Sequence, residues 1–360
     1  MPPRSAPLHA VAPGVAWFAG RRARGVVEHA DLGARPDALA TPGWWALVGE
    51  FEGRVDAWRF AHVEDDDTPV AATAWAGPPP AAWTSSLDHQ DYVAAVHRVR
   101  AHVREGVVYQ ANLCRVLRAP LAPPGGEPDA RALAARLVAG NPAPYAGGVH
   151  VPRGGDVPGA WVVTASPELF LRVQDGTVTS GPIKGTAVTA AGLSAKDRAE
   201  NVMITDLVRN DLQRVCRAGT VRVTQLLGVE QHPGLVHLVS TVAGELTAEV
   251  REAPDAVAQV LAATYPPGSV SGAPKSSALR VIAELEREAR GPYCGLVGWA
   301  HVGADGRLTA ELAVGIRTFW WRDGVLRFGT GAGITWASDA EQEWRETELK
   351  ASRLVALASR

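Results

Sequence analysis

The sequence predicts an α/β protein of the α+β type, in which most strands pair antiparallel and the helices lie outside the sheet. Apolar strand-like runs often follow one another without a helix between them, as at residues 160–165 and 169–173, which favours antiparallel pairing over parallel βαβ units. Other stretches show the apolar spacing of amphipathic helices. A chain of 360 residues with 46% hydrophobic content can form one large domain or two ordinary ones.

The first 85 residues are rich in Pro, Gly, Ala and Trp, and their short apolar runs indicate β-structure and loops rather than long helices. We therefore separate a short amino-terminal segment, 1–85, from the main region, 86–360, within a single structural domain. The apolar stretch from Leu8 to Gly20 is broken by Pro13, and its basic residues follow it, whereas a secretory signal places them first. We expect no targeting or membrane segment.

Helical spacing begins after Asp88, where valines recur on one face until Gly106 ends the run. Four more helices are predicted at residues 129–140, 194–215, 273–289 and 339–357. Strand-like runs occupy residues 160–165, 169–173, 235–246, 294–302, 308–321 and 325–331.

Charge and cysteine content exclude several classes of function. The formal net charge is -2 and the sequence pI is about 6.6, so no field of one sign favours nucleic acid or an anionic membrane as partner. A small molecule or another protein is the better expectation. The three cysteines, Cys114, Cys216 and Cys294, are odd in number and widely spaced, which suits neither a disulfide framework nor a zinc site and fits a cytoplasmic protein.

One segment, residues 164–186, combines a hairpin with two reactive groups. An Asp-Gly turn separates its two strand-like halves, and Glu168 and Lys184 lie on either side. Brought to one cleft, the acid could protonate a leaving group and the amine could attack carbon. A salt bridge at the protein surface is an equally good interpretation of this segment alone. Lys184 is one of only four lysines in an arginine-rich chain, which favours positions that need an amine, although a solvated surface amine is the commoner case.

Two predicted helices carry acids on one face. Asp197 and Glu200 are three residues apart, and Glu343 and Glu346 repeat the spacing with Lys350 on the same stripe. Magnesium prefers oxygen ligands, so one or two carboxylates from each helix would suffice to hold it. Solvated helix faces are the simpler explanation of either string alone.

Glycine-rich turns and three strand residues complete the candidates. Gly268, Ser269 and Gly272 precede Pro274, where free backbone N–H groups at a helix start could bind a carboxylate, and residues 328–338 form a second glycine-rich loop. Neither matches a P-loop. The remaining candidates are Arg317, which could pair with a carboxylate, and His237 and Tyr293, for which a core position is the simpler interpretation.

Taken together, these strings resemble the chorismate-utilising enzymes, a family that includes anthranilate synthase component I, aminodeoxychorismate synthase component I, isochorismate synthase and salicylate synthase. The resemblance covers about residues 88–357 and rests on YQANL, SPELF, GPIKGT, KDRAENVMITDLVRNDLQRVC, VHLVST, PPGSVSGAPK, YCGLVGW, GIRTF and GTGAGITWASDAEQEWRETELK. It implies two mostly antiparallel sheets packed face to face, with helices outside and the site in the cleft between. It makes 86–360 the catalytic region, with part of 1–85 completing the sheets.

The resemblance also implies a role for each candidate residue. Mg²⁺ would be held mainly by Glu200 and Glu346, with Glu343 and Asp197 bound directly or through water, and would clamp one chorismate carboxylate; relatives often have Glu in place of Asp197. The implied contacts of the second carboxylate are Arg317, Gly331, Gly333 and Lys350, while Ser269, Gly272 and Tyr293 line the pocket and His237 lies beneath the ring. Glu168 matches the general acid that protonates the departing 4-hydroxyl.

Two positions distinguish the reactions of the family. Relatives that add water carry a lysine where this chain has Gln110, and relatives that use ammonia resemble it in having glutamine. At Lys184, anthranilate synthases resemble PIAGT and enzymes that aminate carbon 4 resemble PIKGT. The resemblance therefore implies attack of neutral Lys184 on carbon 2, followed by ammonia at carbon 4, in 4-aminobenzoate, folate or related biosynthesis. Burial should lower the lysine pKa from about 10.4.

Other interpretations stay open. Anthranilate synthase component I would require Lys184 to be incidental, and a non-catalytic chorismate-binding subunit would be expected to lack a site carboxylate. None of the three cysteines lies in the GxCxG setting of a glutaminase nucleophile, so we expect ammonia from a separate glutaminase chain. No LLES-like segment is evident, and inhibition by tryptophan is not expected.

Overall fold

The computed structural model describes residues 11–66, 74–124, 126–232 and 235–360. The beginning of the apolar stretch predicted at Leu8–Gly20 lies outside these residues. Within the described ranges, no helix is long and apolar enough to cross a membrane.

Seven α-helices and four 3₁₀ helices are described, and all five predicted helices are among them. The α-helices are α1 (His89–Arg104), α2 (Ala130–Gly140), α3 (Ala195–Gln213), α4 (Ala248–Arg251), α5 (Ala256–Thr264), α6 (Lys275–Leu285) and α7 (Ala340–Ala358). The 3₁₀ helices are η1 (Ala38–Ala40), η2 (Pro80–Ala82), η3 (Ala190–Gly192) and η4 (Gly268–Val270). The prediction missed α4 and α5, and it continued α6 four residues too far.

The described chain contains eighteen strands. They are β1 (Ala12–Phe18), β2 (Arg21–Asp31), β3 (Gly43–Gly49), β4 (Val55–Asp65), β5 (Thr84–Ser85), β6 (Gln110–Pro120), β7 (Tyr145–Val151), β8 (Ala160–Ser166), β9 (Leu169–Gln174), β10 (Thr177–Gly181), β11 (Ile183–Ala187), β12 (Arg222–His232), β13 (Leu235–Glu245), β14 (Gly272–Ala273), β15 (Leu296–Val302), β16 (Leu308–Val314), β17 (Thr318–Arg322) and β18 (Val325–Ile334). The loop predicted at residues 328–338 is thus strand as far as Ile334.

Every described strand pair is antiparallel, and together the pairs form one continuous sheet. Neighbouring strands run in the order β12, β13, β10, β9, β16, β15, β3, β4, β2, β1, β7, β8, β17, β18, β6. The short strand β11 pairs with β13, and β5 and β14 pair with β6. The α+β class with mostly antiparallel strands is confirmed, and the two predicted sheets are halves of one sheet, joined where β2 pairs with β1.

The two halves pack against each other. One hydrophobic core contains Trp44 of β3 and Leu312 of β16 from the first half together with Val149 of β7 and Val162 of β8 from the second. The Trp58 indole of β4 also donates to the Pro158 carbonyl just before β8 (2.9 Å). Strands from residues 12–49 serve both halves, because β1 pairs with β7 and β3 with β15.

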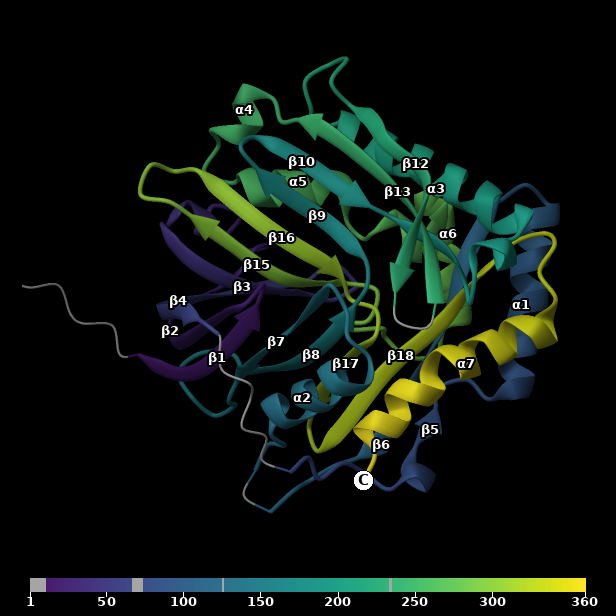
Figure 1. Cartoon of the computed structure of the whole chain (residues 1–360), viewed down its shortest axis with the longest axis horizontal. Coiled ribbons are helices and arrows are strands. Elements are labelled where there is room, and N and C mark those ends of the chain that lie inside the picture. Colours follow the sequence, from purple (N-terminus) through teal and green to yellow (C-terminus); the bar gives the residue numbers. More distant parts are fainter. Residues whose placement is uncertain (1–10, 67–73, 125, 233–234) are drawn as a thin grey trace, which may run out of the picture.

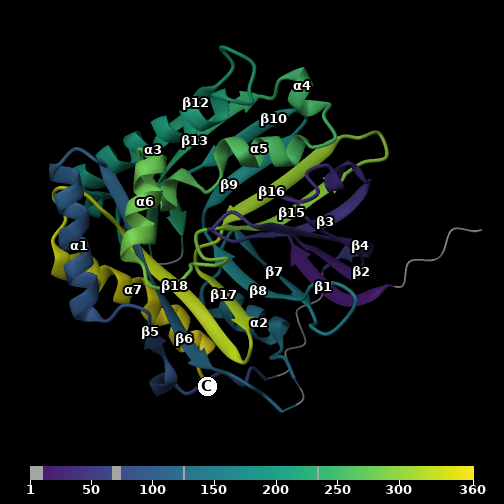
Figure 2. The same cartoon turned by 180° about the vertical axis from the view of Figure 1, so that it is seen from behind.

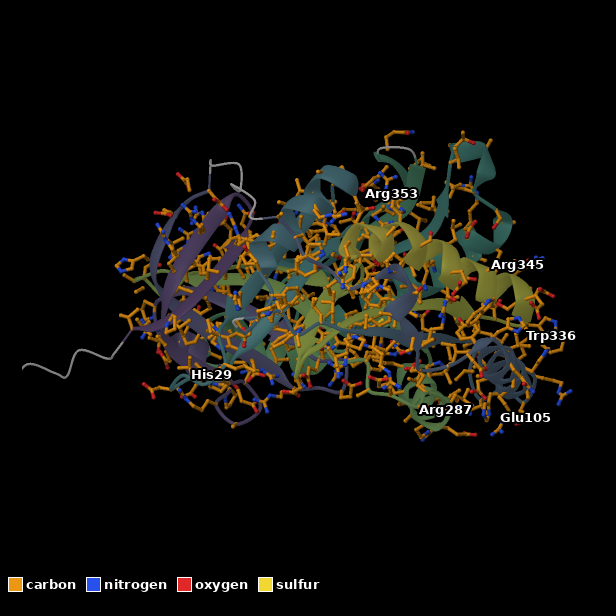
Figure 3. The ribbon with its side chains drawn as sticks, turned by 90° about the horizontal axis from the view of Figure 1, so that it is seen from below. His29, Glu105, Arg287, Trp336, Arg345 and Arg353 are labelled. Atoms are coloured by element: carbon orange, nitrogen blue, oxygen red, sulfur yellow. The ribbon has the colours of Figure 1, made fainter. Side chains whose placement is uncertain are left out.

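Helices cover the outside of this arrangement. Helix α7 lies on one face of the β6–β18 pair and α6 on the other, as the front and back views show (Figures 1 and 2). Viewed from below, His29 of β2 lies at one end of the molecule, and Trp336, which follows β18, lies at the other (Figure 3).

The chain crosses between the two halves of the sheet at several places, and two of these crossings are short connections. It leaves β8 in the second half and enters β9 in the first through Glu168, and it leaves β16 in the first half and enters β17 in the second through Arg317. The two crossings are bonded to the neighbouring strands: Val314 N donates to Glu168 O and Ala165 N donates to Arg317 O, both at 3.0 Å. Glu168 and Arg317, both predicted to be functional, therefore lie where the two halves of the sheet meet, here called the seam.

Candidate active site

Glu168 is almost completely buried at the seam, with 3% of its surface exposed. Burial raises the pKa of its carboxyl to about 7, although the Ser269 hydroxyl, the Lys184 charge and the Ile183 backbone N–H lower it. Its Oε1 atom has no hydrogen-bond partner in the described part of the chain. A carboxyl that keeps its proton near neutral pH can donate it to a leaving group.

Lys184 lies on β11, half-buried, and its charge acts on Glu168. Burial lowers the pKa of its amine, against the opposing effect of the carboxylates of Glu200, Glu168 and Glu346. The direction is the one that a nucleophilic amine needs, because only the neutral form attacks carbon. The hairpin thus brings the acid and the amine together, as predicted, with both pKa values moved toward neutrality.

The Arg317 guanidinium is half-buried and has no ion pair with any residue that the structure describes. Burial lowers its pKa. Arg317 adopts a left-handed backbone (φ 51°), which sets its direction at the seam. A half-buried arginine without a carboxylate partner among the described residues is suited to bind one from a ligand.

Strand β13 places His237 in the interior, opposite Thr186 in the β11 register. Lys184 is two residues from Thr186 on the same strand. His237 therefore lies on the strand adjacent to the one that carries the candidate nucleophile.

The carboxylates of Glu200, Glu343 and Glu346, here called the carboxylate cluster, come from α3 and α7. Burial raises the pKa of Glu200, and repulsion by Glu343 and Asp197 adds to the rise, while Lys184 and Lys196 oppose it. The Lys196 Nζ atom is 3.1 Å from Glu343 Oε1 and 3.7 Å from Glu200 Oε1. The Lys196 ammonium group therefore lies between two carboxylates of the cluster.

Glu346 and Lys350 form the outer part of this region. Their charged atoms are 2.6 Å apart, and both side chains are about half exposed. Burial raises the pKa of Glu346, but Lys350, Lys196 and Lys184 together lower it by more, so that the carboxylate form is favoured. Exposure to water reduces the contribution of this pair to stability.

The cluster has the oxygen donors that Mg²⁺ prefers, and repulsion at Glu200 is what a divalent cation would relieve. Among the described residues, however, no three His, Cys, Asp or Glu side chains are placed to hold a metal ion. The ammonium groups of Lys196 and Lys350 lie beside these carboxylates instead. The donor set fits Mg²⁺ in chemistry, and binding requires the lysine side chains to move.

Asp197 has a structural role at the start of α3. Its Oδ2 atom accepts the Ser194 backbone N–H (2.8 Å) and hydroxyl (2.7 Å), and its own N–H donates to the Ser194 hydroxyl (3.1 Å). This capping box fixes the first turn of the helix that carries Glu200. A metal-binding role for Asp197 stays a prediction.

The glycines of β18 lie along an edge that is partly without a strand neighbour. In the described chain, β6 pairs with β18 along its whole length, whereas β17 reaches only to Phe328. Lys350 Nζ donates to the Gly331 carbonyl (3.0 Å), so the predicted neighbours Lys350 and Gly331 are in contact. A Cβ at Gly333 would lie 2.2 Å from the Gln110 amide nitrogen, so a side chain at this position would force the Gln110 side chain to move.

Ser269 and Gly272 lie on the opposite side of β6. The Ser269 hydroxyl acts on Glu168, and Gly272 pairs with Ala111 next to Gln110. The Gln110 amide nitrogen is 3.4 Å from Glu200 Oε2, and its buried Oε1 has no hydrogen-bond partner within the described ranges. Gln110 thus joins this loop to the carboxylate cluster.

Tyr293 is the predicted site residue with the weakest connection to the others. Its hydroxyl lies 3.8 Å from the Cys114 thiol, and its ring packs against Gly329 in the core. The structure therefore gives Tyr293 packing contacts. Substrate binding by this residue stays a prediction.

Sequence reasoning missed two residues. Lys196 is one of the four lysines of the chain, and its position four residues before Glu200 is the signal that could have identified it. Arg290 is buried, and its guanidinium binds both oxygens of Glu286 and the carbonyls of Val270 and Asn112. It ties the loop containing Ser269 to β6, and no pattern in the sequence predicted those contacts.

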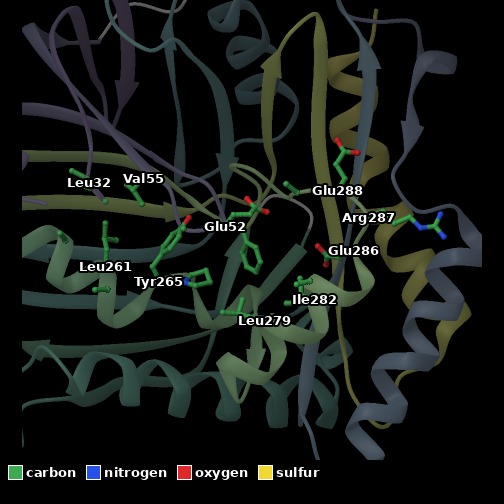
Figure 4. A pocket seen from close by; sticks show the side chains of 18 residues that line it. Leu32, Glu52, Val55, Leu261, Tyr265, Leu279, Ile282, Glu286, Arg287 and Glu288 are labelled. Atoms are coloured by element: carbon green, nitrogen blue, oxygen red, sulfur yellow. The ribbon is translucent and has the colours of Figure 1, made fainter. Parts of the chain in front are cut away.

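A cavity of about 830 Å³ lies elsewhere, between α5, α6 and the amino-terminal strands (Figure 4). It is lined by Leu32, Val55, Leu261, Leu279 and further apolar residues, while Arg287 at its rim points away toward α1. None of the predicted site residues lines it.

Comparison with known proteins identifies the protein family that this chain matches. A model of the chorismate binding enzymes matches residues 50–356. The anthranilate synthase component 1 of Streptomyces coelicolor is 40% identical over 304 residues, which cover 81% of this chain and 56% of that protein. The aminodeoxychorismate synthase component 1 of Klebsiella aerogenes is 32% identical over 357 residues, 93% of this chain and 74% of that protein. The chain thus spans little more than half the length of the Streptomyces relative.

Solved structures show the same fold. Anthranilate synthase component I from Streptococcus pneumoniae superposes with a TM-score of 0.74 at 24% identity, covering 99% of this chain and 94% of that one. The menaquinone-specific isochorismate synthase MenF from Escherichia coli gives 0.73 at 18% identity, covering 99% and 92%. At these identities the likeness concerns the fold alone.

Proposed function

The chain belongs to the chorismate binding enzyme family, and from that premise we propose that it is an aminodeoxychorismate synthase component I. The observation that carries the proposal is the pairing of Lys184 with Glu168. Burial lowers the pKa of the amine and raises that of the acid, so both shifts favour the protonation states that a nucleophile and a general acid need. Environments that shift two titratable groups in this way mark candidate acid and base partners.

The reaction would proceed in two displacements. In the first, Lys184 Nζ bonds to ring carbon 2, both ring double bonds shift by one position around the ring, and the carbon–oxygen bond at carbon 4 breaks while Glu168 protonates the departing hydroxyl, which leaves as water. In the second, ammonia bonds to carbon 4, both double bonds shift back as the lysine–carbon bond at carbon 2 breaks, and a proton of the new ammonium group passes to Glu168. The product is 4-amino-4-deoxychorismate, and the free lysine is regenerated.

Chorismate would be oriented by its two carboxylates. Arg317 and the open edge of β18 near Gly331 and Gly333 are assigned to one of them, because Arg317 lacks an ion pair among the described residues. Mg²⁺ held by the carboxylate cluster would supply a cation for the other. Buried Gln110 replaces the lysine base of water-adding relatives, which disfavours hydration.

Anthranilate synthase component I is the second candidate, and the 40% identity to the Streptomyces coelicolor protein favours it. It predicts a fluorescent aromatic product with release of pyruvate. Lys184 would then be dispensable for chemistry.

Product identity decides between the two. Purified protein is incubated with chorismate, MgCl₂ and NH₄Cl, and chorismate loss and products are followed by mass spectrometry. Amination with retention of the pyruvyl group is expected. Lys184→Arg is the matched variant, since it keeps a long basic side chain that cannot be deprotonated to attack, and it should lose product formation while remaining folded. Anthranilate from the wild type would reject the proposal, and chorismate that is bound but not consumed would favour a non-catalytic chorismate-binding subunit.

Ammonia would come from a separate glutaminase. All three cysteines are buried and free, so none is placed to act as the exposed nucleophile of a built-in glutaminase. Gel filtration with a cognate glutaminase in the presence of glutamine and Mg²⁺ should give a complex. Co-elution failing under these conditions would count against docking.

A further inference from the structure

Lys196 occupies an unfavourable position for a cation. It is the second residue of α3, inside the first turn, where the helix dipole favours negative charge. Its ammonium nevertheless lies between Glu343 and Glu200, at 3.1 and 3.7 Å. The carboxylates of the cluster, rather than its own helix, therefore hold this charge in place.

The ion pair also matters to Glu343. That side chain is only 5% exposed, and Lys196 is its one ion-pair partner among the residues described. A buried carboxylate without a partner is strongly destabilising, so a neighbouring cation stabilises its charged form. Without metal, Lys196 serves as that cation and links α3 to α7.

We propose that Lys196 is an internal counter-ion that a divalent cation must displace, so that Lys196 sets the metal affinity of the site. The inference rests on the proposed Mg²⁺ site. A divalent cation bound to these carboxylates would repel the ammonium beside them, and 40% of the lysine side chain is exposed, so it can swing into water without uncovering the core. On metal binding, the contact between α3 and α7 that the Lys196 ammonium makes would be replaced by a contact through the metal ion.

The test measures metal affinity without chorismate. Mn²⁺ is titrated into purified protein and followed by electron paramagnetic resonance, with Mg²⁺ competition as a second titration. Removing a unit charge about 4 Å from the ligands should tighten binding by about tenfold, so Lys196→Gln should have a roughly tenfold lower Kd. Lys196→Arg keeps the cation and should stay near the wild-type value.

Arg198→Gln is the matched control, because it removes an exposed positive charge two residues away, on a different side of the helix. It should change the Kd by less than about twofold. An equal effect of Arg198→Gln would mean that net charge alone is responsible, and an unchanged or weaker affinity in a folded Lys196→Gln protein would overturn the proposal. Absence of divalent binding in both proteins would overturn it as well.

Thermal melting provides a readout that does not depend on catalysis. Metal-free Lys196→Gln should melt below the wild type, because Glu343 has lost its partner, and saturating Mg²⁺ should raise its melting temperature more than that of the wild type. Equal metal-induced shifts would contradict displacement. The chorismate assay on the same preparations separates the two proposals. If metal affinity depends on Lys196 but no aminated product forms, the proposed amination is rejected and the proposed role of Lys196 stands.

Discussion

Glu168→Gln should stabilise the protein against unfolding, and only above mildly acidic pH. The folded carboxyl has a pKa of about 7 against an ordinary value of 4.5, because burial disfavours its charge. Below pH 4.5 the folded and unfolded states are both protonated. Between pH 4.5 and 7 the unfolded chain releases the proton while the folded chain keeps it, so wild-type stability falls as pH rises, and above pH 7 the loss is complete.

The magnitude follows from the two values. A difference of 2.5 pH units, at about 1.36 kcal/mol per unit, corresponds to about 3 kcal/mol of wild-type stability lost at pH 8. Glutamine has nearly the same shape and does not titrate, so the variant avoids this loss.

Urea unfolding of both proteins at pH 4.5, 6 and 8 measures the difference. The stability of the variant relative to the wild type should increase by about 3 kcal/mol from the lowest to the highest pH. Glu105→Gln, at an exposed helix end, is the control and should show little change across the series. A constant difference between Glu168→Gln and wild type at all three pH values would refute the assignment of a raised pKa to Glu168.

Three further predictions concern other parts of the site. Arg317→Met should lower kcat/KM for chorismate by about 10- to 100-fold, because a charged hydrogen bond is lost, and it should leave the melting temperature nearly unchanged. Unchanged kinetics would exclude Arg317 from carboxylate binding. Arg290→Met should destabilise the chain by about 3–5 kcal/mol in urea unfolding, because Glu286 is left buried without its partner. The double variant with Glu286→Leu should recover much of that loss. A lack of recovery would contradict the pairing of these two residues. Gly272→Ala should lower the free energy of unfolding more than Gly106→Ala does. Both positions have a positive φ, but a Cβ at Gly272 would lie 2.3 Å from a backbone oxygen, whereas Gly106 faces open space. Equal losses would show that backbone strain alone matters.

The elements that the sequence predicted best are those with one buried face. Helices α1 and α7 alternate apolar and charged residues at helical spacing, and the Asp175–Gly176 turn appears with both residues at positive φ. Helix α5 was missed because AVAQVLAAT is apolar almost all round. Strand β6 was missed because seven consecutive residues are buried, which removes the alternation by which a half-exposed strand is recognised.

Helix α6 shows how tertiary contacts override local preference. The helical pattern continues to about Ala289, but Glu286 leaves the helix and its carboxylate accepts bonds from Arg290 and from the Cys114 backbone. Those partners come from another strand and a later turn, so no local signal marks the end of the helix at Leu285.

The sequence by itself determined the class of fold, most helices and the chemical identity of the site residues, because these depend on local periodicity and on which side chains are present. Only the tertiary structure decided that one sheet supplies both halves, that Glu168 and Arg317 lie at two neighbouring short crossings between them, and that Lys196 reaches Glu343. The physical reason is that burial, pKa values and ion pairs depend on neighbours far away in the chain, whereas spacing along the sequence records only neighbours within an element.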